Sequence, residues 1–330
     1  MTTATLPAPK DSRETARPYS SWPAQGRPEG WFRAPLGPDA ARFYQEQGFL
    51  VLENALSPDE VAEMNAEALH ICRGEAGKIQ GAPTAAAGES DEEVLRRYLC
   101  IHFPDRVSKV MAKYLAHPSM VDVLTRVIGP DVKCMQSMLF IKASGKPGQA
   151  WHQDELYIPT RDRSLCGGWI AMDDATVENG CLWVIPGSHK AGVLWPQHDH
   201  GDRRFDCAWE SIGFPYTPAD EVPVEVKAGS IVFFNGYLLH RSFPNRAQSG
   251  YRRVLVNHYM SAQSLLPWFH TDKKVPIGTA DARDILMVAG RDPYAYKGTS
   301  QVHEAFLRPS GEGGCGTKAA DKPAGDAPKA

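Results

Sequence analysis

The chain has 330 residues, 36 lysines and arginines against 39 aspartates and glutamates, a formal net charge of -3 and a hydrophobic content of 42%. This is ordinary globular composition, and a nearly neutral chain lacks the clustered basic face that binds nucleic acid. The sequence contains neither an apolar stretch of roughly 20 residues nor an N-terminal secretory signal. We therefore expect no nucleic-acid partner, no membrane insertion and no secretion; the oligomeric state is left open.

The seven cysteines are odd in number, scattered along the chain and free of any C-x-x-C pair. This spacing indicates neither a disulfide framework nor a thiolate zinc site. We expect reduced, mostly buried cysteines in a cytoplasmic protein.

Both ends of the chain lack hydrophobic periodicity. Residues 1–35 and 309–330 are rich in proline, glycine and charged residues, which predicts a flexible N-terminal tail and a disordered C-terminal tail. The remaining residues, 36–308, are expected to form a single domain.

Helices dominate the first part of that domain. Residues 38–47 predict a short helix, and the apolar residues 49–52 predict a strand directly after it. A second helix is expected to begin after Ser57, because the spacing from Ser57 to Glu60 is that of a capping box. The small and acidic residues of 81–94 predict a mobile loop.

After a further helix expected over 118–127, the chain changes to short apolar runs separated by turn residues. Asn179-Gly180 is typical of a hairpin turn. This pattern of short apolar runs favours an all-β sandwich or barrel over alternating strands and helices. The sequence contains no dinucleotide-binding motif and no P-loop motif. Strands are expected in five segments: 132–143, 167–172, 181–185, 222–234 and 252–260.

A histidine and an aspartate two residues apart on a strand face the same side, so an H-x-D motif can present two metal ligands. The chain has three such pairs: His152/Asp154, His200/Asp202 and His270/Asp272. The second lies in a charged run that predicts a solvated loop, and the third follows the last convincing strand. The first is framed by β runs on both sides, which favours it as the metal site.

His240 is the best candidate for a third ligand, because it ends an apolar strand and its short return. Two histidines and one carboxylate on one face of a metal form the facial triad of non-haem Fe(II) oxygenases. Ser242 and Arg252 follow, and a guanidinium near a hydroxyl suits the capture of a carboxylate. Arg253 is an immediate rival, since neighbouring strand residues face opposite ways.

Several of these segments together resemble the phytanoyl-CoA dioxygenase family, over roughly residues 38–262. The segments are 152–154, 169–172, 179–189 and 240–242, with Asn245 and Arg252. The resemblance implies a mainly β fold with flanking helices: a double-stranded β-helix, or cupin-like jelly roll, with an N-terminal helical elaboration. It also implies Fe(II), 2-oxoglutarate as cosubstrate and dioxygen.

The family's functional positions match seven residues of this chain. They are the iron ligands His152, Asp154 and His240, the groups for the distal carboxylate of 2-oxoglutarate, Arg252 and Ser242, and the pocket-lining Trp169 and Met138. One position departs from the family, since Ile101 stands where some members have a lysine. Asp154 implies hydroxylation or a related oxidation, because halogenating relatives are expected to have a small residue there.

The resemblance thus implies a dioxygenase that hydroxylates a C–H bond of a small organic substrate and releases succinate and CO2. Arginines near the ligands favour an anionic substrate: Arg161, Arg163, Arg241 and Arg246. Two alternatives stay open at this point. One is a zinc hydrolase that uses the same triad with Glu155 as general base; the other is a non-catalytic β-helix protein that binds a small molecule.

Overall fold

The computed structural model of the protein describes residues 29–206, 209–266 and 283–308. Within them, no helix is both long and apolar enough to cross a lipid bilayer. The α-helices precede most of the strands and are α1 (Pro38–Gln47), α2 (Pro58–Cys72), α3 (Asp91–Arg96), α4 (Lys109–Leu115) and α5 (Pro118–Val127).

The strands form two main sheets and a small ribbon. In sheet order, the larger sheet contains β1 (Trp31–Phe32), β2 (Phe49–Leu52), β11 (Ile231–Asn235), β6 (Cys166–Ala171), β13 (Tyr251–Ser261), β4 (Val132–Ala143), β3 (Cys100–His102) and β15 (Phe306–Arg308), with β14 (Leu286–Ala289) also paired to β4. The smaller sheet contains β10 (Val222–Val224), β7 (Leu182–Val184), β12 (His240–Ser242) and β5 (Gln149–His152). The ribbon joins β8 (Gln197–Asp199) to β9 (Trp209–Ser211).

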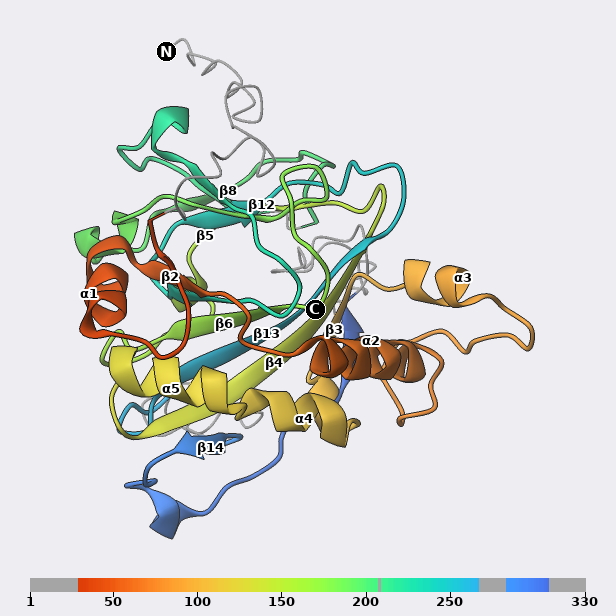
Figure 1. Cartoon of the computed structure of the whole chain (residues 1–330), viewed down its shortest axis with the longest axis horizontal. Coiled ribbons are helices and arrows are strands. Elements are labelled where there is room, and N and C mark those ends of the chain that lie inside the picture. The colour runs from red at the N-terminus through yellow and green to blue at the C-terminus, as the bar shows by residue number, and fades with distance from the viewer. Residues whose placement is uncertain (1–28, 207–208, 267–282, 309–330) are drawn as a thin grey trace, which may run out of the picture.

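The larger sheet lies between the helices and the smaller sheet. In Figure 1, α2, α4 and α5 run along one face of β4, β6 and β13, while β5 and β12 lie on the other side. One hydrophobic cluster, with Leu139 and Leu255, joins the helices to the outer face of the larger sheet. A second, with Val232 and Val256, fills the space between the two sheets.

Alternation along each strand explains why both faces of the larger sheet are apolar. In β11, Ile231 and Phe233 belong to the helix-side cluster, and Val232 and Phe234 to the cluster between the sheets. Successive side chains of a strand point to opposite faces, so a continuous apolar run is required where both faces are covered. A polar side chain of the inner face is therefore costly unless it finds a partner between the sheets.

Most of the predicted elements are confirmed. The helices expected over 38–47, after Ser57 and over 118–127 are present, and the capping box of Ser57 and Glu60 has both of its hydrogen bonds. Strands occur within each of the five expected segments.

Two boundaries were wrong. Residues 29–35 are not all tail, because Trp31 and Phe32 form β1 and pair in parallel with β2. The expected loop over 81–94 contains the start of α3 at Asp91, which a second capping box, of Ser90 and Glu93, stabilises. Residues 1–28 and 309–330 of the predicted tails lie outside the described residues.

The hairpin expected at Asn179-Gly180 is also wrong. A turn is present, with Gly180 at a φ of 82° and the Asn179 side chain accepting a hydrogen bond from the backbone N–H of Thr176 at 2.8 Å. However, the preceding strand β6 belongs to the larger sheet and the following β7 to the smaller one. A turn motif reports how the chain reverses locally, not which strands pair afterwards.

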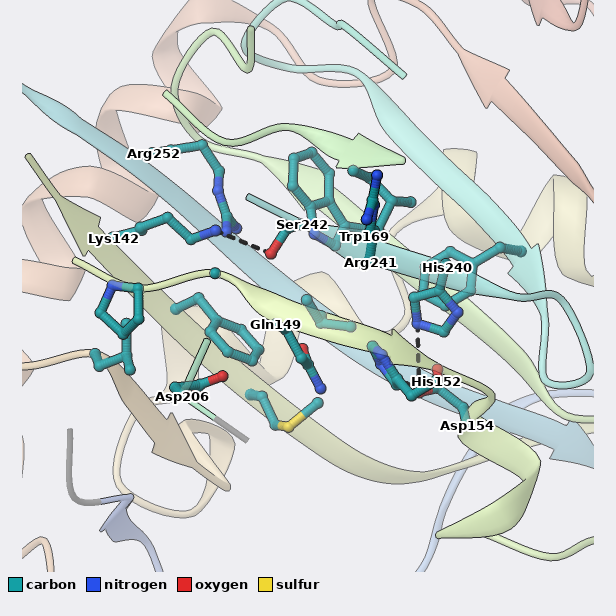
Figure 2. Close-up of a pocket in the computed structure, with 18 of the residues that line it drawn as sticks. Lys142, Gln149, His152, Asp154, Trp169, Asp206, His240, Arg241, Ser242 and Arg252 are labelled. Carbon is teal, nitrogen blue, oxygen red and sulfur yellow. Dashed lines mark hydrogen bonds and ion pairs between the residues drawn. The ribbon is translucent and has the colours of Figure 1, made fainter. Parts of the chain in front are cut away.

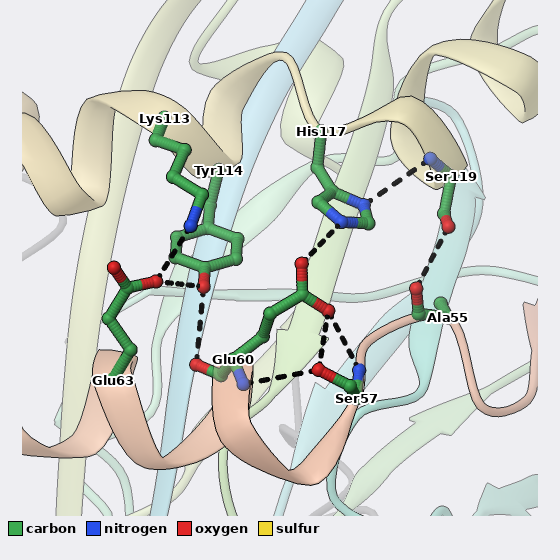
Figure 3. Close-up of polar contacts among 8 residues, drawn as sticks. All are labelled: Ala55, Ser57, Glu60, Glu63, Lys113, Tyr114, His117 and Ser119. Carbon is green, nitrogen blue, oxygen red and sulfur yellow. Dashed lines mark hydrogen bonds and ion pairs between the residues drawn. The ribbon is translucent and has the colours of Figure 1, made fainter.

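A polar cluster joins the start of α2 to α4 and α5 (Figure 3). One carboxylate oxygen of Glu60 accepts hydrogen bonds from the backbone N–H and hydroxyl of Ser57, at 2.8 and 3.0 Å. The other accepts one from Nε2 of His117, the N-cap of α5, at 3.1 Å. Lys113 and the Tyr114 hydroxyl of α4 both bind Glu63. These contacts fix the helices that support the larger sheet from outside.

Removing the Glu60 carboxylate tests how much this cluster stabilises the fold. We expect Glu60→Ala to lower the free energy of unfolding by about 1 kcal/mol at neutral pH, the usual worth of a helix cap. Hydrogen bonds from Ser57, aided by His117, lower the pKa of Glu60. Its contribution is therefore complete above the ordinary glutamate pKa of about 4.3 and is lost as pH falls through the lowered folded-state pKa.

Chemical denaturation at about pH 7 and about pH 3 measures this contribution. The matched control is Glu67→Ala on the same helix, because the Glu67 carboxylate forms no hydrogen bond with a described residue. An equal effect of Glu60→Ala at both pH values would contradict the assignment.

Candidate metal centre and cosubstrate pocket

Two histidines face each other across neighbouring strands of the smaller sheet. His152 ends β5 and His240 begins β12, and the antiparallel register makes them direct partners, with ring centroids 4.0 Å apart. Nδ1 of each ring lies near a backbone carbonyl two residues earlier: that of Ala150 at 2.8 Å for His152 and that of Leu238 at 2.9 Å for His240. A carbonyl only accepts, so Nδ1 carries the proton and Nε2 is left as a metal-binding atom.

Asp154 completes the group from the turn that directly follows β5. Its Oδ1 lies 3.5 Å from Nε2 of His152 and 3.5 Å from Nε2 of His240. Ligand atoms about 2.1 Å from one ion and at right angles to each other lie about 3 Å apart, so this spacing fits a divalent metal. Among the described residues, these three form the one group of this kind whose ligand atoms lie within 4.8 Å of one another.

The electrostatics of the group also suit a metal. Burial, reinforced by the nearby His240, lowers the pKa of His152 to about 3, so the imidazole is neutral at physiological pH. Burial by itself would raise the pKa of Asp154, but the neighbouring His240 and His258 outweigh it and hold that pKa well below its usual range. A neutral imidazole and an ionised carboxylate are the forms that bind metal ions.

The other four predicted site residues line the same pocket as these three. Figure 2 shows Trp169, Ser242 and Arg252 within it, and Met138 belongs to its wall. Arg252 is 3% exposed, and its guanidinium forms no hydrogen bond with a described residue. The Cζ atom of the guanidinium lies 5.5 Å from the centre of the Trp169 ring. Burial lowers the pKa of Arg252 to about 10, so the side chain remains charged at neutral pH. A buried cation that makes no direct ion pair with a described residue is costly, and an anion bound here would offset that cost.

The rival Arg253 lies on the opposite face of β13. It binds both carboxylate oxygens of Asp173, with nitrogen–oxygen distances of 2.8 and 2.7 Å. Arg252, by contrast, belongs to the pocket wall, on the same side as Val254 and Val256 of the cluster between the sheets. Strand alternation thus separates the two arginines, and Arg252 is the one available to a ligand.

Lys142 was missed by the sequence analysis. It is the register partner of Arg252 on β4 and is 2% exposed. Its Nζ donates hydrogen bonds to Oγ of Ser242 at 2.9 Å and to the carbonyl of Phe243 at 2.8 Å. Since Lys142 donates to Ser242, the Ser242 hydroxyl hydrogen is free to point elsewhere in the pocket. A lysine two positions after the pocket-lining Phe140 is the sequence signal that could have revealed it.

Two further polar residues of the pocket were also missed. Nε2 of His258, on β13, lies 3.0 Å from Oδ2 of Asp154. Asp206 lines the pocket opposite the metal ligands and pairs with Arg308 of β15. Both come from segments whose pairing depends on distant strands, so no local motif marks them.

The remaining H-x-D pairs do not form metal sites in the described residues. Nδ1 of His200 accepts a hydrogen bond from the backbone N–H of Asp202 at 2.8 Å, and Asp202 binds Arg204 through its carboxylate. The pair His270/Asp272 lies outside the described residues. Among the described residues the His200 pair belongs to no group that could hold a metal, but the run around it is not all loop, because Gln197–Asp199 form β8 and pair with β9.

Glu155, the general base required by the hydrolase alternative, does not reach the metal pocket. Its Oε1 accepts hydrogen bonds from the N–H and hydroxyl of Thr160, at 2.6 and 2.5 Å, and Glu155 is absent from the pocket wall. Ile101, at the position of the family's lysine, is fully buried in the helix-side core. Neither residue contributes a group to the pocket.

The four arginines expected near the substrate are scattered. Arg161 and Arg163 are exposed and do not line the metal pocket. Arg241 does line it and is held by Glu221 at 2.5 Å and by the rings of Trp151 and Phe243. Arg246 lines a neighbouring surface hollow instead.

A family model described as phytanoyl-CoA dioxygenase (PhyH) matches residues 44–254. The chain belongs to the phytanoyl-CoA dioxygenase family. The peroxisomal phytanoyl-CoA dioxygenase of Rattus norvegicus is 32% identical over 250 residues, which cover 69% of each protein. A probable phytanoyl-CoA dioxygenase of Caenorhabditis elegans is 29% identical over 243 residues, covering 68% of this chain and 75% of the relative.

Solved structures share the fold of this family member. The non-haem monooxygenase ThoJ superposes with a TM-score of 0.58 at 23% identity, covering 76% of this chain and 84% of ThoJ. The epimerase SnoN, determined with Fe3+ and α-ketoglutarate, gives 0.53 at 21% identity, over 81% and 93% of the two chains. With the two facing sheets, these likenesses confirm the predicted cupin-like jelly roll.

Substitution of His152 tests the metal centre directly. We expect His152→Ala to abolish Fe(II) binding measured by anaerobic calorimetry, because it removes one of three ligand atoms that lie close together. His200→Ala is the matched control from a rejected H-x-D pair and should bind like the wild type. Thermal unfolding without metal verifies that each variant is folded; a folded His152→Ala with wild-type affinity would exclude this ligand set.

Proposed function

We propose that the protein is an Fe(II)- and 2-oxoglutarate-dependent dioxygenase that hydroxylates a C–H bond of a small organic substrate and releases succinate and CO2. One observation carries the proposal: a preformed group of two histidines and an aspartate shares a pocket with a buried arginine that forms no hydrogen bond or ion pair with a described residue. The fold and family membership agree with it. We also propose that residues 36–308, together with β1, form a single domain, because the larger sheet includes both Trp31 and Arg308.

His152, Asp154 and His240 would hold the metal through Nε2, Oδ1 and Nε2. Bound Fe(II), with 2-oxoglutarate and dioxygen, supplies the oxidising chemistry that this set of side chains lacks. The protein's part is to hold the ligands in one tautomer and to leave the other coordination positions open.

Arg252 and Ser242 would hold the distal carboxylate of 2-oxoglutarate. Arg252 offers an unused guanidinium, and Ser242 offers a hydroxyl hydrogen that Lys142 leaves free by donating to its oxygen. Lys142 would add positive charge when an anion is bound: burial, followed by the charge of Arg252, lowers its pKa well below the ordinary value, and a bound carboxylate would stabilise its charged form. This part of the pocket is therefore suited to an anion.

The apolar side chains of the pocket have a separate role. Met138 and Trp169 line it, and both are register partners of Val256, which lines it as well. They exclude water from the region where the cosubstrate would lie, and each charge-assisted hydrogen bond becomes stronger as the local dielectric falls.

Anaerobic titration with Fe(II) and 2-oxoglutarate tests the function. We expect a metal-to-ligand charge-transfer band, then succinate once oxygen is admitted. Arg252→Gln should weaken 2-oxoglutarate binding roughly 10- to 100-fold, because a charge-assisted hydrogen bond contributes about 1.5–3 kcal/mol. The control is Arg253→Gln, which alters the neighbouring residue on the opposite face and should change binding less than about threefold.

The same experiment separates the alternatives. Neither band nor succinate from the wild type would refute the dioxygenase and favour a non-catalytic binding protein. Zinc-dependent hydrolysis has no support from Glu155, which Thr160 holds outside the pocket. The cytoplasmic location stays a prediction; the name of the rat relative places that protein in the peroxisome.

We propose further that the substrate is anionic and that its charged part binds beside the pocket mouth. A surface hollow shares Pro147 with the metal pocket and is lined by Arg203, Arg204 and Arg246. Arg204 is paired with Asp202, whereas Arg203 and Arg246 are exposed and form no side-chain ion pair with a described residue. A phosphate-bearing thioester, such as the phytanoyl-CoA in the relatives' names, has the charge that this hollow attracts.

Phytanoyl-CoA-dependent succinate formation tests this substrate class. Arg203→Ala with Arg246→Ala should raise KM for phytanoyl-CoA about tenfold and leave KM for 2-oxoglutarate unchanged, since two exposed ion pairs contribute roughly 1–2 kcal/mol. Added salt should raise KM for phytanoyl-CoA in the wild type and not in the variant. Arg126→Ala, on α5 and paired with Asp122, is the control. A KM indifferent to both arginines and to salt would contradict the role of the hollow.

A further inference from the structure

His258 joins the proposed metal centre to the opposite sheet. It lies on β13 of the larger sheet and is 2% exposed, whereas the ligand histidines belong to the smaller sheet. Its Nε2 lies 3.0 Å from Oδ2 of Asp154. The contact spans 104 residues of sequence and connects the two layers at the site itself.

The two oxygens of Asp154 have different surroundings. Oδ1 lies 3.5 Å from Nε2 of both ligand histidines, while Oδ2 is the oxygen that faces His258. An ionised carboxylate only accepts hydrogen bonds, so Nε2 of His258 carries the proton and donates it. His258 thus takes one lone pair of Oδ2, while Oδ1 is the oxygen that lies beside both ligand histidines and is directed at a metal.

That division matters for an oxygenase. A carboxylate that bound through both oxygens would take an additional coordination position, which the cosubstrate or dioxygen needs. Partners that orient a ligand are usually important for metal affinity, because they fix the direction of its lone pairs.

We propose that His258 is a positioning residue that holds Oδ2 of Asp154, so that this carboxylate binds the metal through Oδ1 alone. The proposal rests on the proposed function and assigns to it a residue outside the ligand set. His258 does not touch the substrate or cosubstrate; it acts through Asp154.

A purely space-filling role does not account for His258. Its Nδ1 is buried and has no hydrogen-bond partner among the described residues, which is a cost that an apolar side chain would avoid. The neighbours on the strand, Val256 and Met260, are apolar. Within the described part of the chain, the polar contact of the ring that offsets this cost is the one to Asp154.

The backbone at this point also favours a directed side chain. The register between β13 and β4 shifts between His258 and Tyr259: His258 pairs with Gln136, and Tyr259 pairs with Cys134, so Met135 is an extra residue on β4. A β-bulge bends its strand and redirects the side chains around it. His258 is the last residue of β13 before this shift, on the side that faces the pocket.

Three variants of one strand test the proposal. His258→Leu keeps much of the volume and removes the donor, His258→Gln can restore an N–H at the position of Nε2, and Tyr259→Phe is the control. Tyr259 is fully buried on the helix side, where its hydroxyl donates to the carbonyl of Leu115 at 2.8 Å. Loss of that hydrogen bond perturbs the core without touching the metal centre.

Anaerobic calorimetry with Fe(II) provides the decisive reading, with thermal unfolding of the metal-free proteins alongside. We expect His258→Leu to weaken Fe(II) binding roughly 10- to 100-fold, as for other partners of ligands, and His258→Gln to recover most of it. Tyr259→Phe should bind like the wild type even if its unfolding temperature falls. If His258→Leu does not fold, His258→Asn takes its place and is compared with His258→Gln. The amide of asparagine is shorter than that of glutamine and does not reach Asp154.

The proposal would be overturned if folded His258→Leu, or His258→Asn in its place, bound Fe(II) with the affinity of the wild type. The charge-transfer band of the wild type keeps this failure distinct from failure of the proposed function. A wild type that shows the band while the His258 variants match it in affinity rejects His258 alone. A wild type without the band rejects the dioxygenase, whatever the variants do.

Discussion

The antiparallel pairing of β12 with β5 is the constraint on which the site depends. It sets His240 opposite His152, although 88 residues of sequence separate them, and it makes their Nε2 atoms converge on Oδ1 of Asp154. Because side chains alternate along a strand, slipping the pairing by one residue would turn one histidine away from the other. The pairing of β12 with β7 on its other side holds that register.

The space between the sheets combines an apolar core with a few buried charges. Lys142 and Arg252 are register partners on β4 and β13, and both are buried. Two neighbouring cations in a low dielectric repel each other and lose hydration, which is tolerated only when hydrogen bonds or an anion compensate. Lys142 donates to Ser242 and to backbone carbonyls, and Arg252 forms no hydrogen bond with a described residue. The protein thus gives up stability at Arg252 where a bound carboxylate would restore it.

The helices stabilise the larger sheet from the other side without entering the pocket. Their cluster packs against the outer residues of the strands, such as Leu139 and Leu255, and the contacts of Glu60 and Glu63 hold α2 to α4 and α5. A sheet that is covered on both faces bends little, so side chains on β13 and β4 keep their positions relative to the smaller sheet. His258, which reaches Asp154 across the gap, depends on that rigidity.

Local chemistry in the sequence determined the helices with their caps and identified the H-x-D pair and His240 as candidate ligands, because each depends on residues within a few positions or on one neighbouring strand. The family resemblance added the fold and the expected roles of Arg252, Ser242, Trp169 and Met138. Tertiary structure alone decided that Arg252 and not Arg253 faces the pocket, since in a strand that is apolar on both faces the alternation does not reveal which face is which. It also decided the places of Lys142 and His258, whose partners Ser242 and Asp154 are 100 and 104 residues away. Contacts at that separation follow from the pairing of whole strands, which no local motif specifies.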